Sequence, residues 1–147
     1  MDYLIHLLRN LTITKDIEES LQKRNQKLLF NNINENLTSV LIAQVFDLLK
    51  QNILIVTPNL YQAQKLYDKL VQMLGELHVY FFPMDEFISA EMLASSSEFR
   101  QERINTLTNI IKRKKGIIVT HTIGAIRKLP PKDIFNDSII TISNFDV

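Results

Sequence analysis

The chain alternates short apolar runs with longer stretches whose apolar residues recur three or four positions apart. The short runs predict strands, and the longer stretches predict amphipathic helices between them. The strands are expected over 27–30, 52–57, 77–82, 116–120 and 138–142, and the helices over 38–50, 60–74, 95–111 and 122–128. Because strands that alternate with helices form parallel sheets covered by helices, the pattern predicts a three-layer α/β domain with a mainly parallel sheet.

Local signals define the ends of the middle elements. Asn59 follows Pro58 and precedes a long helical repeat, so it is expected to cap the helix over 60–74. Gly75 comes directly after the last periodic residue and predicts the end of that helix. The run over 52–57 is rich in β-branched residues, which is typical of a strand covered on both faces.

The remaining segments give weaker patterns. Two short helices are expected before the first strand, one over 2–8 and one capped by Thr14. Ser95 and Glu98 have the spacing of a capping box at the start of the next helix. The segment 84–94 mixes apolar and acidic residues, and it fits a docking surface for another domain as well as a loop packed on its own core.

Composition excludes several classes of site. The 147 residues suit one domain, and a net charge of +1 gives no overall attraction to nucleic acid or acidic membranes. The absence of cysteine removes disulfides, thiolate nucleophiles and Cys-ligated zinc. No apolar run is long enough to span a bilayer, and the N-terminus lacks the features of a secretion signal, so a cytoplasmic location is expected.

The turn between the first predicted strand and its helix is where a phosphate-binding loop stands in P-loop proteins. Residues 31–39 contain no glycine that lets the backbone approach an anion and no lysine that reaches a phosphate. They place the carboxylate of Glu35 in the middle of the turn. The position of this turn therefore matches a nucleotide-binding loop, but its residues do not provide the groups that bind phosphate.

Several blocks of sequence occur in the order and spacing of a known family. They lie at 54–66, 80–86, 96–103, 116–120 and 125–131, and the most specific reads NLYQA at 59–63. From 27 to 142 the chain resembles the N-terminal region of the bacterial transcription-repair coupling factor family, Mfd, whose first module is similar to the excision-repair helicase UvrB. The resemblance implies a RecA-like, P-loop-type domain with a degenerate nucleotide loop. It also implies three parts: an N-terminal helical segment over 1–25, the RecA-like domain over 26–136, and the start of an inserted domain over 137–147.

Positions in the nucleotide loop follow from this resemblance. Asn32 and Glu35 stand where glycines are expected, Thr38 replaces the lysine, and Ser39 keeps the hydroxyl that would meet magnesium. The expectation is a fragment that holds no cofactor, has no catalytic residue and binds no metal. The loop allows two interpretations: Thr38 and Ser39 bind a phosphate at the helix N-terminus, or Asn36 or Thr38 caps the helix. The missing lysine and the charge of Glu35 favour capping.

The resemblance also implies where the activities of the full-length protein reside. The family protein is an ATP-dependent DNA translocase, a helicase-like hydrolase that removes stalled RNA polymerase and recruits the UvrA/UvrB machinery of nucleotide excision repair. ATP and Mg belong to its later motor domains, as do contacts with RNA polymerase and double-stranded DNA, and UvrA binds the inserted domain. This fragment is expected to be non-enzymatic and to support the insertion and autoinhibitory contacts with other domains of the same chain.

The sequence allows more than one interpretation of several other residues. The run Lys112, Arg113, Lys114 and Lys115 is either a solvated helix end or a patch with residual DNA binding. Asp85 and Glu86 follow a strand end, where α/β proteins place acids, but they read as ordinary loop carboxylates. The three histidines, His6, His78 and His121, have no metal-site spacing. The alternative for the whole chain is a stand-alone nucleotide- or DNA-binding α/β domain.

Overall fold

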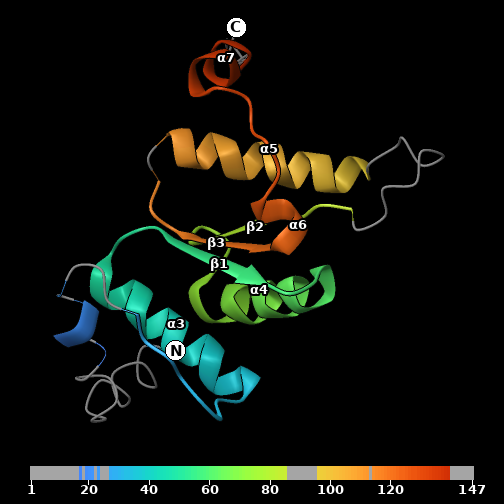
Figure 1. Ribbon diagram of the computed structural model, residues 1–147. Helices are drawn as coiled ribbons and strands as arrows, with labels where there is room; N and C mark the ends of the chain where they lie inside the picture. The colour runs from blue at the N-terminus through green and yellow to red at the C-terminus, as the bar shows by residue number, and fades with distance from the viewer. Residues whose placement is uncertain are drawn as a thin grey trace, which may run out of the picture.

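A computed structural model describes residues 17, 19–21, 23, 27–85, 96–112 and 114–139. In these ranges the chain forms an α/β fold (Figure 1). Its elements are α3 (Glu35–Leu49), β1 (Ile53–Thr57), α4 (Leu60–Leu74), β2 (Val79–Phe82), α5 (Ser97–Ile111), β3 (Ile117–His121), α6 (Thr122–Ala125) and α7 (Lys132–Asp137).

The three described strands form one parallel sheet in the order β1-β3-β2. β3 lies in the centre, and its first residue, Ile117, pairs with Ile53 of β1 and Val79 of β2. Helix α4 packs on one face of the sheet with α3 beside it, and α5 packs on the other face against β2 (Figure 1). The predicted α/β class with a parallel sheet is therefore confirmed for the described residues.

The core lies between the sheet and α4. Leu70 of α4 is fully buried against alternate residues of the strands, which are Val79, Phe81, Ile117 and Val119. Tyr67 stacks on Phe81 with ring centroids 5.0 Å apart. Burial of one such side chain contributes about 1.5–3 kcal/mol, so this layer anchors the sheet.

Helix α4 confirms its local signals. It runs from Leu60 to Leu74, and the side chain of Asn59 accepts a hydrogen bond of 2.9 Å from the backbone N–H of Gln62. Gly75 follows with φ of 81°, a left-handed value that favours glycine.

The prediction that residues 52–57 are covered on both faces is wrong. Ile53 and Ile55 point toward the core, but Leu54 is 62% exposed and Val56 is 48% exposed on the other face. The reason is that α5 packs against β2 at the far edge of the sheet, and the short helix α6, which does contact β1, leaves Leu54 and Val56 exposed.

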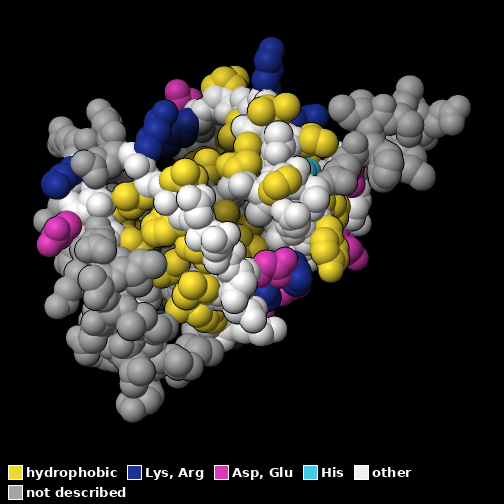
Figure 2. Space-filling model, turned by 60° about the horizontal axis from the view of Figure 1, so that its bottom comes forward, with side chains coloured by type: hydrophobic (Ala, Val, Ile, Leu, Met, Phe, Trp, Pro, Cys, Tyr) yellow, Lys and Arg dark blue, Asp and Glu magenta, His cyan; other side chains and the backbone are white. Residues whose placement is uncertain are grey.

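The predicted strand over 27–30 is also absent. These residues have no strand conformation, and Leu29 is 85% exposed. β1 pairs only with β3 within the described sheet, so the segment adds no strand beside it. Leu28 and Phe30 instead line a cavity of about 560 Å³ beside α3. Apolar side chains gather on the side of the molecule that carries α3 (Figure 2).

The ends of the later elements differ from the predictions. Helix α6 ends at Ala125 rather than continuing to 128, and α7 follows the two prolines although no helix was predicted there. Ser138 ends α7 and Ile139 has no strand conformation, which contradicts the start of the predicted strand over 138–142. Residues 140–147 lie outside the described residues.

Several predicted features lie wholly or partly outside the described residues. Ser95, Thr14 and the helix over 2–8 lie outside the described residues, as do residues 86–94 of the ambiguous connection. Helix α5 begins at Ser97, and the side chain of Ser96 before it makes no capping hydrogen bond.

Candidate functional site

The predicted nucleotide loop leads into α3, and its cap differs from the prediction. The side chain of Asn34 accepts a hydrogen bond of 2.9 Å from the backbone N–H of Leu37. The prediction that Asn36 or Thr38 caps the helix is therefore wrong, because the helix already begins at Glu35. Asn36 lies within the first turn, which frees its side chain for a contact with another helix.

The two hydroxyl groups of the loop bond to their own helix. Thr38 Oγ1 donates to the carbonyl oxygen of Asn34 at 3.0 Å. Ser39 Oγ donates to the carbonyl oxygens of Asn36 at 2.9 Å and Glu35 at 3.2 Å, and Ser39 is buried. These contacts direct both hydroxyls toward backbone carbonyls rather than toward a bound group.

Asn32 adopts a left-handed conformation, with φ of 58°. The resemblance places a glycine at this position, and glycine is the residue that enters this region without steric cost. Asparagine tolerates it better than most residues, because its short side chain bonds locally. The backbone thus keeps a conformation that suits the expected glycine, although the glycine itself is missing.

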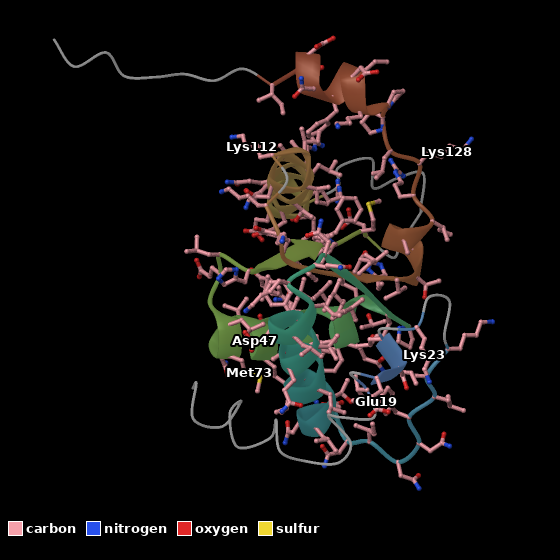
Figure 3. All side chains as sticks on the ribbon, turned by 90° about the vertical axis from the view of Figure 1, so that its left-hand side faces the viewer. Glu19, Lys23, Asp47, Met73, Lys112 and Lys128 are labelled. Atoms are coloured by element: carbon pink, nitrogen blue, oxygen red, sulfur yellow. The ribbon has the colours of Figure 1, made fainter. Side chains whose placement is uncertain are left out.

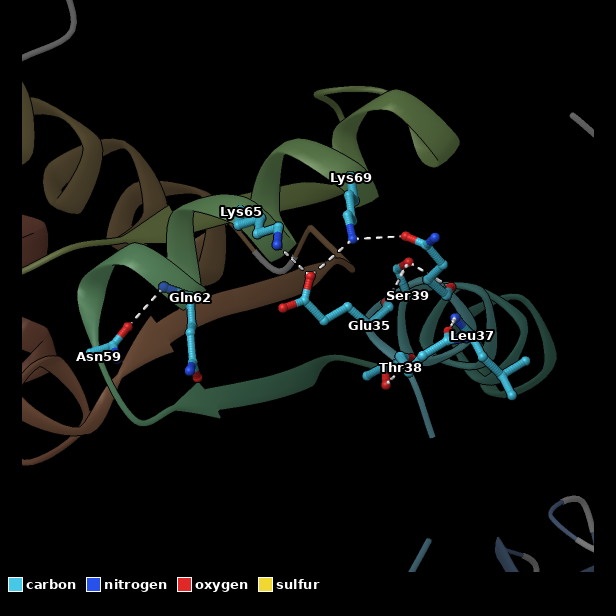
Figure 4. A network of polar contacts seen from close by, with 10 residues as sticks. Glu35, Leu37, Thr38, Ser39, Asn59, Gln62, Lys65 and Lys69 are labelled. Carbon is cyan, nitrogen blue, oxygen red and sulfur yellow. Dashed lines mark hydrogen bonds and ion pairs between the residues drawn. The ribbon is translucent and has the colours of Figure 1, made fainter. Parts of the chain in front are cut away.

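Glu35 contacts two lysines from the neighbouring helix (Figure 4). Its Oε2 lies 2.6 Å from Lys65 Nζ and 3.3 Å from Lys69 Nζ. Lys69 Nζ also donates to Asn36 Oδ1 at 2.8 Å. We call Glu35, Asn36, Lys65 and Lys69 the carboxylate latch, since they join the first turn of α3 to the middle of α4.

These contacts shift the pKa values of Glu35 and Lys65. Hydrogen bonding to Lys65, and then to Lys69, lowers the pKa of the Glu35 carboxyl. The same carboxylate raises the pKa of the Lys65 ammonium. Glu35 and Lys65 therefore stay ionised near neutral pH, and the carboxylate lies where a bound anion would meet the two lysines.

A cavity of about 290 Å³ lies beside the carboxylate latch. It opens at the carboxyl end of β1, where Thr57 joins its lining, and Gln62 and Leu66 of α4 complete one wall. Ligands of α/β proteins bind at the carboxyl ends of parallel strands. The volume is at the lower limit of about 300 Å³ that is usual for small-molecule pockets.

The structure thus brings Glu35 and Thr38 to this cavity, and it turns Ser39 into the helix. Sequence reasoning missed Lys65 and Lys69, which supply the positive charge that the loop lacks. Their spacing of four residues places both on one face of the predicted helix, and this was the available signal. Their contact with Glu35 depends on how two helices pack.

The other candidate residues that the structure describes do not line this cavity. Lys112 directly follows α5, so the basic run begins at a helix C-terminus, as predicted. Asp85 follows β2, while Glu86 and His6 lie outside the described residues. His78 precedes β2 instead of lying within a strand, and His121 is the fully buried last residue of β3.

The described residues offer neither a metal site nor a membrane-spanning helix. These residues contain no group of three or more His, Cys, Asp or Glu placed to hold a metal ion. None of the helices in the described ranges has the length and apolar content needed to cross a membrane.

Comparison with known proteins gives one consistent result. The chain is 27% identical over 142 residues to the transcription-repair-coupling factor of Bacillus subtilis, a match that covers 97% of this chain and 12% of the relative. It is 28% identical over 117 residues to that of Staphylococcus haemolyticus, covering 80% of this chain and 10% of the relative. With the Staphylococcus aureus protein the identity is 30% over 102 residues, or 69% of this chain and 9% of the relative.

The chain therefore spans about a tenth of the length of these curated relatives. No family model matches it. No solved structure matches it either. The resemblance identified from the sequence is confirmed, and over most of its length this chain is homologous to the transcription-repair-coupling factors.

Proposed function

We propose that this chain is the N-terminal, non-catalytic part of a transcription-repair coupling factor. It is a RecA-like domain that has lost nucleotide binding and acts as a structural support. The observation that carries this proposal is the carboxylate latch, in which Glu35 faces Lys65 and Lys69 at the carboxyl end of β1. Similarity to the relatives supports the family, and the carboxylate latch gives a physical reason for the loss of nucleotide binding.

The latch opposes nucleotide binding in two ways. A phosphate approaching Lys65 and Lys69 meets the negative charge of Glu35 and has to displace it from both ammonium groups. The backbone N–H groups of Leu37 and Thr38 are already bonded to Asn34. A helix N-terminus binds phosphate through free N–H groups, and the Asn34 side chain occupies that of Leu37.

In the full-length protein we propose that this part supports the inserted domain that binds UvrA and takes part in contacts that restrain the motor. ATP hydrolysis, translocation on DNA and displacement of RNA polymerase belong to later domains under this proposal, and the protein is cytoplasmic. The exposed residues Leu54 and Val56 are consistent with contact between this part and other domains, because they leave one face of β1 uncovered.

A calorimetric titration of the chain with Mg-ATP tests the loss of nucleotide binding. No saturable heat is expected below millimolar concentration, because both lysines that line the cavity in the described part of the chain are paired with Glu35. A control variant, Lys65→Met with Lys69→Met, identifies any weak binding that depends on those cations alone. Saturable binding in the unmodified chain, or a triphosphate seated against the N–H groups of Leu37 to Ser39 in a crystal, would refute the proposal.

The second candidate function is a stand-alone nucleotide- or DNA-binding domain. The observation in its favour is that Lys65 and Lys69 both face a cavity at a strand end. Fluorescence polarisation with labelled double-stranded DNA across a salt series separates the two, since phosphate contacts give affinity that falls steeply with salt. The support role predicts no such binding at physiological ionic strength.

A further inference from the structure

A second hollow, of about 660 Å³, lies at the opposite end of the sheet from the carboxylate latch. It is formed where several elements begin or end: α3 and α4 end beside it, and the chain enters β2 and β3 there. Asp47 of α3 and Met73 of α4 lie next to each other on this side of the molecule (Figure 3). We call it the basic hollow, and its lining has an apolar floor and a rim of lysines.

The floor presents large apolar side chains. Phe46 and Tyr80 are buried, and Phe46 packs against the ring of His78 with centroids 5.8 Å apart. Met73 extends the floor, and Leu77 is 79% exposed at its edge. An exposed leucine next to a concave apolar surface is a feature of interaction sites, because water contact there is removed when a partner binds.

The rim carries three lysines from two segments distant in sequence. Lys50 comes from the end of α3, and Lys114 and Lys115 come from the turn before β3. Lys50 pairs with Asp47. Lys114 and Lys115 are exposed and form no ion pair with a described residue, so the rim has unbalanced positive charge.

We propose that the basic hollow binds an acidic peptide segment that carries a large apolar side chain. The apolar side chain fits against Phe46, Met73 and Leu77, and carboxylates beside it pair with Lys114 and Lys115. Apolar anchors in a concave surface give most of the affinity of such contacts, while charges at the rim select the partner and speed association. This inference does not depend on the proposed loss of nucleotide binding.

The lining favours a peptide over a nucleic acid. A protein that binds DNA through its phosphate backbone neutralises several phosphates along a row, whereas among the described residues two lysines without an ion pair line this surface. The apolar floor gains little from a phosphate, but it shields an apolar side chain from water.

The experiment is a selection from a displayed library of random peptides on the full 147-residue chain, followed by fluorescence polarisation with the enriched peptides after labelling. Enriched peptides should carry glutamate or aspartate around one or two leucine or phenylalanine residues. Reversing both rim charges, in Lys114→Glu with Lys115→Glu, should weaken binding by about tenfold or more, at about fivefold for each exposed ion pair. Leu77→Ser should weaken it by a similar factor through loss of apolar contact.

Matched controls make the result specific to this surface. Lys128→Glu with Lys132→Glu reverses two exposed charges that do not line the basic hollow, and Ile126→Ser removes an equally exposed apolar side chain. These variants should bind the peptides as the unmodified chain does, and circular dichroism verifies that all variants fold. The proposal is overturned if the library yields no enriched peptide, if enriched peptides lack acids, if the Leu77 and lysine variants bind unchanged, or if double-stranded DNA binds this surface more tightly.

Discussion

Two pairs of lysines at opposite ends of one sheet have different surroundings. Lys65 and Lys69 lie near the carboxyl end of β1, where Glu35 neutralises part of their charge. Lys114 and Lys115 lie where β3 begins, and they have no acidic partner among the described residues. At the end of the sheet where α/β proteins usually bind ligands, Glu35 offsets the positive charge of the two lysines. At the other end, no described acid offsets the charge of Lys114 and Lys115.

The difference shows that a count of cations does not identify an anion site. Both pairs stand beside a hollow, but the net charge available to a partner depends on the acid that folding brings close. In the first pair that acid lies 30 residues before Lys65 in the chain. In the second pair the floor is apolar, so binding there depends on burial as well as charge.

The largest effect is expected from adding a methyl group beneath the basic hollow. A Cβ at Gly116 would overlap the ring of Tyr80 and lie 2.9 Å from the carbonyl oxygen of His78, which is backbone and cannot move freely. Gly116→Ala should therefore lower the free energy of unfolding by about 1–3 kcal/mol, the usual cost of overpacking a close-packed site. Urea denaturation followed by circular dichroism measures this change.

A substitution at the neighbouring residue, Lys115→Ala, separates the steric effect at Gly116 from the effect of charge in the basic hollow. It removes an exposed side chain, so the free energy of unfolding should change by about 0.5 kcal/mol or less. Peptide binding to the basic hollow should weaken in both variants, but stability should fall only in Gly116→Ala. Equal stability of the two variants would show that the contact between Gly116 and Tyr80 is looser than described.

A smaller effect is expected at the other lysine pair. Glu35→Gln removes the negative charge of the carboxylate latch and leaves two cations facing a cavity of about 290 Å³. The affinity for inorganic pyrophosphate should rise by about fivefold, the effect of one exposed ion pair. Isothermal titration with pyrophosphate at low salt measures the change.

Adding Lys65→Met to Glu35→Gln provides the control. If the new binding comes from the freed cations, the double variant should lose the gain. A gain that persists without Lys65, or no gain in Glu35→Gln, would mean that the carboxylate does not keep anions from this cavity. Lys115→Ala removes a charge from the basic hollow and Glu35→Gln removes one from the carboxylate latch, so together they test whether charge balance explains the difference.

Sequence patterns gave the elements whose signals are local. The helix over 60–74 has its cap at Asn59 and its stop at Gly75, and the structure confirms both ends. The middle strands were predicted to within two residues at each end for the same reason, since each has its own apolar run beside a turn. These signals need no knowledge of the rest of the fold.

Features that depend on pairing over distance were not predicted. The run over 27–30 has the composition of a strand, but composition does not state whether a partner strand is available, and Leu29 is exposed. The cap at Asn34 was missed because several asparagines precede α3 and each one can cap a helix. The latch was missed because only packing of α3 on α4 brings Glu35 to Lys65.

The smallest expected effect is the pH dependence that the carboxylate latch gives to stability. The pKa of Glu35 is lower in the folded chain than its ordinary value of 4.5, so the latch stabilises the fold above that value and loses this effect as pH falls through the lowered pKa. The pKa of Lys65 is raised above its ordinary value of 10.5, so the contribution is fully present below 10.5 and is lost as pH rises through the raised pKa. The difference in melting temperature between the unmodified chain and Glu35→Gln should therefore be constant between these limits and should shrink in acid. Asp137→Asn is a suitable control for the loss of one exposed carboxylate, because Asp137 forms no ion pair with a described residue. A Glu35→Gln difference that stays constant in acid well below 4.5 would mean that Glu35 is not held by the two lysines, and the two ends of the sheet would then not differ in the way described.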